Sequence, residues 1–240
     1  MKRQDLHTHT TYSDGKNTPE EMILAAAYEG LDTIGISDHS YTSIDESYCI
    51  KKDKIAEYAA EISALKEKYK GKIEVLCGIE QDYFSDEPTD MFDYAIGSVH
   101  YIKAGGEYIP VDESAEILKK AADKHFDGDM YALIEEYYRL EADVIRKTNA
   151  DIIGHFDLIT KFQERTPLFD ERNPRYISAW KKACDELLKT KKPFEINTGA
   201  ISRGYRTTPY PSEEIRQYIL ENNGTLILSS DSHTTDSVGK

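Results

Sequence analysis

Two histidines stand one residue apart near the start of the chain, in the stretch DLHTHTTYSDG. In an extended strand His7 and His9 would project from the same face, because successive side chains alternate between the two faces. Imidazole is a common ligand of zinc, iron and manganese ions. Taken alone, the pair is as compatible with a solvated strand end as with a metal site.

Further side chains of this kind stand at the ends of other short apolar runs. Six of the seven histidines in the chain stand at the end of such a run, which is more than chance would place there. We interpret the seventh, His125, as a surface residue. One ion takes only about four to six ligands, and carboxylates can bridge ions, so the set predicts a site for two or three metals. With the nearby Asp14, the nine candidate ligands are His7, His9, Asp14, His39, Glu80, His100, His155, Asp231 and His233.

The elements that must position these ligands can be read from the apolar runs. Each run has the length and the Ile, Val and Leu content of a strand, and the seven runs are DLHTH, TIGISDH, IEVLCGIEQ, YAIGSVH, DIIGHF, FEINTG and TLILSSDSH. Amphipathic segments between most of them predict helices at about 19–30, 55–71 and 129–147, and from 174 and 212 onward. Residues 103–128 are the least regular and are expected to form a loop with one short helix, whereas 82–92 is too short for a helix.

Strands that alternate with helices indicate right-handed βαβ units and a parallel sheet. Seven strands favour an irregular (β/α)7 barrel, in which the carboxyl ends of all strands open on one face. The candidate ligands would therefore meet at that face. Because the sequence stops at Lys240, soon after the seventh run, we expect the barrel to lack a closing C-terminal helix and its open flank to be covered in a homo-oligomer.

The size and composition of the chain narrow the class of protein further. A chain of 240 residues suits a single domain spanning 1–240, and its net charge of −14 argues against binding of long nucleic acid. The three cysteines are widely spaced and form no disulfide framework. No apolar run approaches the roughly 20 residues of a membrane helix, and the first strand begins too early for a signal peptide. We expect a cytoplasmic protein that does not associate with membranes.

The motifs HTH…SDG, SDH, GIE, GSVH, GHFD and SDSH together resemble those of the polymerase-and-histidinol-phosphatase (PHP) superfamily over nearly the whole chain. The resemblance implies a distorted seven-stranded TIM-like barrel and three divalent metal ions, which could be Zn²⁺, Mn²⁺ or Fe²⁺. Glu80 would bridge two of the ions. The implied ligand sets are His7, His9, Glu80 and Asp231 for one ion, Glu80, His100 and His155 for a second, and Asp14, His39 and His233 for a third.

Three stretches narrow the resemblance to the histidinol-phosphatase branch: FDYAIGSVHYI, DIIGHFDLITKF and EINTGAISRGYRTTPYPS. This branch implies a small-molecule substrate, L-histidinol phosphate, hydrolysed in histidine biosynthesis to L-histidinol and phosphate. The nucleophile would be a hydroxide that bridges metals, which lower the pKa of the parent water and neutralise charge on the phosphoryl group.

Cationic side chains that follow the fifth and sixth strands are candidates for binding the phosphate. Arg203 is the first choice, because its planar guanidinium matches phosphate oxygens, and Arg206 and Lys161 are further candidates. Relatives commonly show NTSGLR where this chain has NTGAISR. Whether Arg203 matches the arginine of that motif therefore depends on the conformation of the loop. Asp231 or a metal-bound water would protonate the leaving alkoxide.

Other functions share parts of this pattern. A PHP-type phosphodiesterase, or a nucleotide or phosphotyrosine phosphatase, would use the same metal ligands. A non-catalytic metal-binding module, of the kind attached to polymerases, is disfavoured because no ligand position has been lost. An amidohydrolase also begins with HxH, but GSVH and SDH fit its histidine set poorly.

Overall fold

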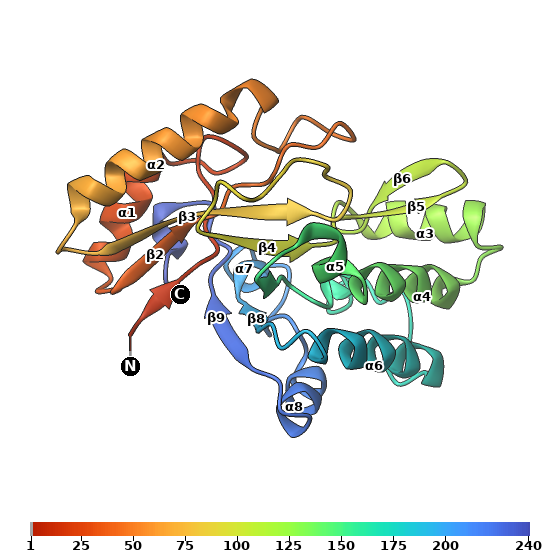
Figure 1. Ribbon diagram of the computed structural model, residues 1–240. Helices are drawn as coiled ribbons and strands as arrows, with labels where there is room; N and C mark the ends of the chain where they lie inside the picture. Colours follow the sequence, from red (N-terminus) through yellow and green to blue (C-terminus); the bar gives the residue numbers. More distant parts are fainter. Residues whose placement is uncertain (1) are drawn as a thin grey trace.

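The computed structural model describes residues 2–240 and contains one sheet of seven parallel strands in the order β1-β2-β3-β4-β7-β8-β9 (Figure 1). Neighbours in the sheet follow one another along the chain, apart from a hairpin inserted after β4, as is usual for successive βαβ units. The predicted seven-stranded barrel is thereby confirmed. Its strands are β1 (Gln4–Asp5), β2 (Thr33–Ile36), β3 (Glu74–Asp82), β4 (Tyr94–Ser98), β7 (Ile152–Ile153), β8 (Phe194–Asn197) and β9 (Leu226–Ser229).

Helices cover the outside of the sheet in two groups. α1 and α2 pack against β2 and β3 around one apolar cluster, and α3, α4 and α6 pack around a second on the opposite side (Figure 1). The Thr18–Glu21 capping box that begins α1 is present, with Glu21 accepting from the Thr18 backbone amide at 2.8 Å. The helices are α1 (Pro19–Tyr28), α2 (Ile55–Tyr69), α3 (Ala115–His125), α4 (Met130–Glu141), α5 (Val144–Thr148), α6 (Pro174–Leu188), α7 (Gly199–Ser202) and α8 (Glu213–Glu221), with short 3-10 turns η1 (Lys52–Lys54), η2 (Leu158–Thr160) and η3 (Thr235–Ser237).

The interior of the barrel is narrow and is filled by the ring of Tyr94 from β4. Gly35 and Gly78 face this ring, and a Cβ atom at either position would collide with it. The Tyr94 hydroxyl crosses the barrel and donates a hydrogen bond to the carbonyl of Leu6. The bottom of the barrel is therefore a packed core, and only the carboxyl-end face has room for a site.

Two segments differ from the expectation. Residues 103–128, expected to be a loop with one short helix, contain α3 and most of a hairpin of β5 (Tyr101–Ala104) and β6 (Glu107–Pro110). The single helix expected at 129–147 breaks between α4 and α5. The break lets Val144 and Thr148 lie over Gly97 of β4, where any side chain would collide with Thr148.

The barrel closes between β1 and β9 by hydrogen bonds just beyond the two strands. The His9 amide donates to the Ser232 carbonyl at 2.8 Å, and the Ser232 amide donates to the His7 carbonyl at 3.2 Å. Below them the Asp5 carboxylate, 1% exposed, accepts from the amides of Ser230 (3.0 Å) and Gly239 (2.9 Å) and from the Ser230 hydroxyl. The buried Asp5 side chain thus supplies hydrogen bonds between the two edges of the barrel in place of a β1–β9 strand ladder.

The chain beyond β9 continues as η3, which packs against α1, with Val238 buried in the α1–α2 cluster. Leu228 of β9 has 57% of its surface exposed on this flank. Self-association through the flank stays a prediction. Over residues 2–240, none of the helices combines the length and apolar character needed to cross a membrane.

Asp5→Ala should lower the free energy of unfolding by about 2–4 kcal/mol, because it removes a buried acceptor and leaves the Ser230 and Gly239 donors unpaired. Urea denaturation of metal-free protein measures the change without masking by bound ions. The exposed Asp90 provides the matched control, and Asp90→Ala should shift the free energy by no more than about 0.5 kcal/mol. Equal stability of the two variants would show that Asp5 does not hold the barrel closed.

Candidate metal centre

The nine predicted ligands lie together at the carboxyl-end face of the barrel. Glu80 is inside β3, and Asp14 comes from the loop between β1 and α1. The other seven follow directly after five different strands, where the pleat ends and the chain turns: His7 and His9 after β1, His39 after β2, His100 after β4, His155 after β7, and Asp231 and His233 after β9. His125, interpreted as a surface residue, is half-buried on α3, where its ring contacts Glu107 at 3.2 Å.

The Glu80 carboxylate is at the centre of the cluster, 1% exposed, with five imidazoles around it, of which His9 is the most distant, with Nε2 3.6 Å from Oε2. Oε1 is 2.9 Å from His155 Nε2 and 3.3 Å from His100 Nε2. Oε2 is 2.8 Å from His39 Nδ1 and 3.2 Å from His7 Nε2. Burial alone would raise the pKa of Glu80, but the neighbouring histidines hold it well below its usual range. The group is an ionised carboxylate with both oxygens directed at ligands.

A second group of ligands gathers around Asp14. Its Oδ2 is 3.2 Å from His233 Nε2, and its Oδ1 is 3.6 Å from His39 Nε2 and 3.8 Å from His9 Nδ1. His9 is fully buried between the two groups. Burial, together with the neighbouring His233 and His39, lowers the pKa of His9 to about 3, so its imidazole is neutral and free to bind a cation.

Asp231 connects the cluster to a cationic side chain. Its backbone is left-handed, with φ of 49°, a conformation that is uncommon outside glycine and that accompanies many functional sites. Asp231 Oδ1 is 3.2 Å from His9 Nε2, while Oδ2 is 2.9 Å from Arg203 Nη2. Burial would raise the pKa of Asp231, but Arg203 and His7 hold it well below the usual range.

The donor set fits divalent metal ions. Three groups each have their ligand atoms within 4.8 Å of one another: His9, Asp14, His39 and His233; His7, His9 and Glu80; and His39, Glu80 and His100. Within residues 2–240, the buried atoms that form no hydrogen bond include His7 Nε2, both nitrogens of His9, and Glu80 Oε2. An unpaired buried polar atom costs about 1–3 kcal/mol, and cations at these points would satisfy all four. Glu80 belongs to two of the groups, as a bridging ligand would.

The metal-free side chains group differently in two places from the sets that the resemblance implies. His9 lies in the Asp14 group as well as in the Glu80 group, and His39 lies close to Glu80 as well as to Asp14. Both imidazoles stand between the two groups, with rings 4.4 Å apart between centroids. The cluster is therefore continuous.

Several polar residues that support the ligands were not predicted. Asp82 Oδ2 is 3.2 Å from His100 Nδ1, and the Ser98 hydroxyl donates to Glu80 Oε1 at 2.7 Å. Asp38 is fully buried and accepts from the backbone amide of Thr10 at 2.7 Å, which fixes the loop after His9. The available signal was the same for all three: a polar side chain at the end of an apolar strand.

The three cations predicted to bind phosphate occupy different surroundings. Arg203 borders the cluster, with Nη1 2.9 Å from His233 Nδ1. Lys161 is mostly buried beside Asp112, with Nζ 3.2 Å from its carboxylate. Arg206 instead packs over the Tyr210 ring, 4.7 Å from its centroid, and donates to the Thr160 hydroxyl.

Two cavities open beside the cluster. One, of about 530 Å³, is lined by Arg203 and His233 among other residues. The other, of about 370 Å³, is lined on one side by ligands and on the other by two aromatic and several acidic side chains; its lining includes His39, His100, Tyr48, Tyr101, Asp45, Asp112 and Glu113. The site thus combines a buried set of metal ligands, a bordering guanidinium and space for a small organic molecule.

Known proteins are similar to this chain in sequence. The chain is 30% identical over 200 residues to the probable histidinol-phosphatase of Schizosaccharomyces pombe, a match that covers 76% of this chain and 61% of that protein. It is 29% identical over 246 residues to the probable histidinol-phosphatase of Deinococcus radiodurans, covering 98% of this chain and 88% of the relative.

Solved structures show the same fold. The HisK protein of Listeria monocytogenes superimposes with a TM-score of 0.84 at 21% identity, over 99% of this chain and 97% of that one. Histidinol phosphate phosphatase from Lactococcus lactis, solved in complex with zinc, L-histidinol and phosphate, superimposes with a TM-score of 0.71 at 22% identity, over 98% and 87% of the two chains.

The family model described as the PHP domain matches residues 5–199, which include seven of the nine ligands. The two outside the match, Asp231 and His233, lie at the same face of the same barrel. Sequence motifs, barrel topology and the family match agree, and we conclude that this chain belongs to the PHP domain family.

Proposed function

We propose that this protein is a metal-dependent phosphatase that hydrolyses L-histidinol phosphate to L-histidinol and phosphate. The observation that carries the proposal is the convergence on one face of nine side chains of the types that bind metals, with Arg203 at their border. Relatives over most of the chain are histidinol-phosphatases, and a protein of the same fold binds zinc, L-histidinol and phosphate. The three cysteines are buried and unbridged, which supports the proposed cytoplasmic location.

Three divalent ions, either Zn²⁺, Mn²⁺ or Fe²⁺, are the proposed complement of the site. Glu80 would hold two of them, one with His7, His9 and Asp231 and the other with His100 and His155; Asp14, His39 and His233 would hold the third. When bound, such ions supply a water of lowered pKa as nucleophile and neutralise negative charge on the phosphoryl group.

Side chains of the protein would bind the phosphate and compensate charge beside the ions. Arg203 would bind phosphoryl oxygens through its guanidinium, whose planar donors match them. Its contact with Asp231 holds it at the border of the cluster and compensates its charge until substrate arrives. The low pKa of Asp231 keeps that carboxylate ionised, which favours holding a cation over donating a proton to the leaving alkoxide.

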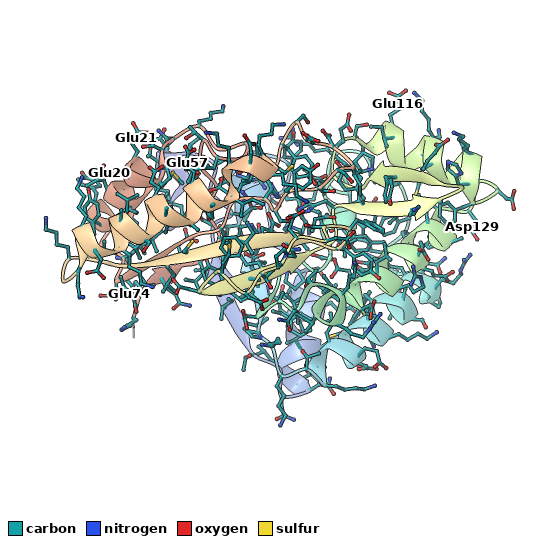
Figure 2. All side chains as sticks on the ribbon, turned by 45° about the horizontal axis from the view of Figure 1, so that its top comes forward. Glu20, Glu21, Glu57, Glu74, Glu116 and Asp129 are labelled. Carbon is teal, nitrogen blue, oxygen red and sulfur yellow. The ribbon has the colours of Figure 1, made fainter. Side chains whose placement is uncertain are left out.

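The alcohol part of the substrate would occupy the cavity beside His39 and His100. Histidinol carries an ammonium and an imidazole, and this cavity is lined by carboxylates and by the rings of Tyr48 and Tyr101. Many other acids lie elsewhere: Figure 2 shows Glu20, Glu57 and Glu116 on the outer helices. Local carboxylates, together with the field of the whole chain, would therefore favour a cationic alcohol.

Elemental analysis of purified or reconstituted protein should find between two and three equivalents of Zn, Mn or Fe. Removal of the metal with a chelator should abolish activity and lower the melting temperature, because the ions bind only the folded state. One equivalent or less after reconstitution would refute a trinuclear centre.

Glu80→Gln should lose metal and activity together, because a neutral amide is a poor bridging ligand. Metal content and phosphate release are measured on the same preparation. Glu67→Gln, at an exposed position of α2 paired with Lys70, is the control and should change neither. Two or more equivalents of metal with normal turnover in Glu80→Gln would show that Glu80 is only a buried strand-end carboxylate.

Phosphate release from a panel of phosphomonoesters tests the substrate. The kcat/KM for L-histidinol phosphate should exceed those for p-nitrophenyl phosphate and AMP at least about 100-fold, or about 2.7 kcal/mol of discrimination. Arg203→Ala should lower kcat/KM about 100-fold for all three substrates alike, because it removes a contact to their shared phosphate. Arg139, exposed on α4 and paired with Glu136, gives the control Arg139→Ala.

Similar kcat/KM values for all the phosphomonoesters would indicate a phosphatase of broad specificity. Preference for a nucleotide would indicate a nucleotide phosphatase, and preference for a phosphodiester such as bis-p-nitrophenyl phosphate would indicate a PHP-type phosphodiesterase. Loss confined to one substrate in Arg203→Ala would show that Arg203 contacts the alcohol rather than the phosphate.

A further inference from the structure

Strand β8 is the one strand of the seven that supplies none of the predicted ligands, yet two of its polar side chains face the cluster. Glu195 and Asn197 are two residues apart and therefore project from the same face of the strand. Both are fully buried, with no exposed surface. A carboxylate and an amide in such a position must be held by specific partners.

Glu195 has three hydrogen-bond partners, of which two are N–H donors and the third is a ring nitrogen of His7. Oε1 is 2.6 Å from Nδ1 of His7. Oε2 accepts from the backbone amide of His155 at 2.9 Å and from the side-chain amide of Asn197 at 3.0 Å. Oε2 therefore accepts from two N–H groups, which leaves Oε1 for the ring nitrogen of His7.

We propose that Glu195 is a positioning residue for the metal centre, which keeps the proton of His7 on Nδ1 and leaves the Nε2 lone pair free to bind metal. Nε2 of His7 is directed at Glu80 Oε2, 3.2 Å away, and forms no hydrogen bond to any residue between 2 and 240. A carboxylate behind a ligating histidine fixes its tautomer and ring orientation and increases its basicity. The inference rests on the metal site of the proposed function but not on its substrate.

Glutamine cannot replace this carboxylate without a conflict. If the NH₂ group of a glutamine at this position faced His7, its N–H would meet Nδ1 and drive the proton to Nε2, the atom needed by the metal. If it faced the other way, it would meet the N–H groups of His155 and Asn197. Each orientation places donor against donor, so the charge and the acceptor pattern are both required.

Asn197 extends the same arrangement to another ligand. Its Nδ2 donates to Glu195 Oε2 and lies 3.2 Å from Asp231 Oδ2, while its Oδ1 accepts from the Gly199 amide at 2.9 Å. The amide thus separates two buried carboxylates that would otherwise repel each other. Through this pair, β8 orients ligands that follow β1 and β9.

The test compares zinc affinity in wild type and in Glu195→Gln by competition with a chromophoric chelator. The variant should bind its weakest-held zinc about 10–100-fold less tightly, the usual cost of losing such a partner. The matched control is Glu141→Gln, which makes the same substitution at another fully buried glutamate, one that accepts from Tyr137 within α4. Its zinc affinities should stay within about twofold of wild type.

A second measurement uses wild-type protein alone and does not depend on the folding of a variant. Long-range ¹H–¹⁵N correlation spectra of the zinc-loaded protein report which nitrogen of His7 carries the proton. The proposal expects a protonated Nδ1 and a metal-bound Nε2. Protonation of Nε2, or unchanged zinc affinity in a folded Glu195→Gln variant, would overturn it. A protein that binds zinc as expected but ignores L-histidinol phosphate would refute only the proposed substrate.

Discussion

A carboxylate buried among histidine side chains is the interaction on which the site depends. Removing an ionised carboxylate from water costs several kcal/mol unless charges and donors compensate it. Glu80 meets this requirement with histidines supplied by four different strand ends, at 2.8–3.3 Å. The same condition makes it a strong ligand, because an ionised, dehydrated carboxylate attracts cations in a medium of low dielectric constant.

The arrangement couples the site to closure of the barrel. His7 and His9 follow β1, while Asp231 and His233 follow β9, and these strands are joined by the hydrogen bonds near Ser232 and by Asp5 below. Ions held by ligands from both strands would tie the two edges together. Metal binding would then stabilise the closed barrel, because binding to the folded state alone adds to its free energy of unfolding.

The acidic side chains of the molecule fall into two groups, one on the surface and one at the site. Acidic side chains dominate the formula, and many of them lie on the outer helices, where water screens them. Those around the cavity beside His39 and His100 face a confined volume together with two tyrosine rings. Fields are focused in such a cleft, so a few local carboxylates weigh more than the net charge in the choice of an alcohol group.

The sequence by itself determined the fold and the nine candidate ligands, because both follow from local patterns. Apolar runs of strand length alternate with capped helices, and in a parallel barrel every strand end lies on one face. The motif spacing then assigned the chain to its family. The hairpin of β5 and β6 and the break between α4 and α5 were missed, because packing over Gly97 and pairing across residues 101–110 are contacts that no local pattern records.

Only the tertiary structure decided how the ligands are held and which cations accompany them. Glu195 reaches His7 across 188 positions of sequence, and Asp5 reaches Ser230 across 225, so neither role has a local signature. Arg203 and Arg206 look alike in the sequence, yet one borders the cluster and the other packs over Tyr210. The physical reason is that hydrogen bonds and burial depend on distance in space, which chain closure sets, whereas residue type and spacing constrain only the backbone nearby.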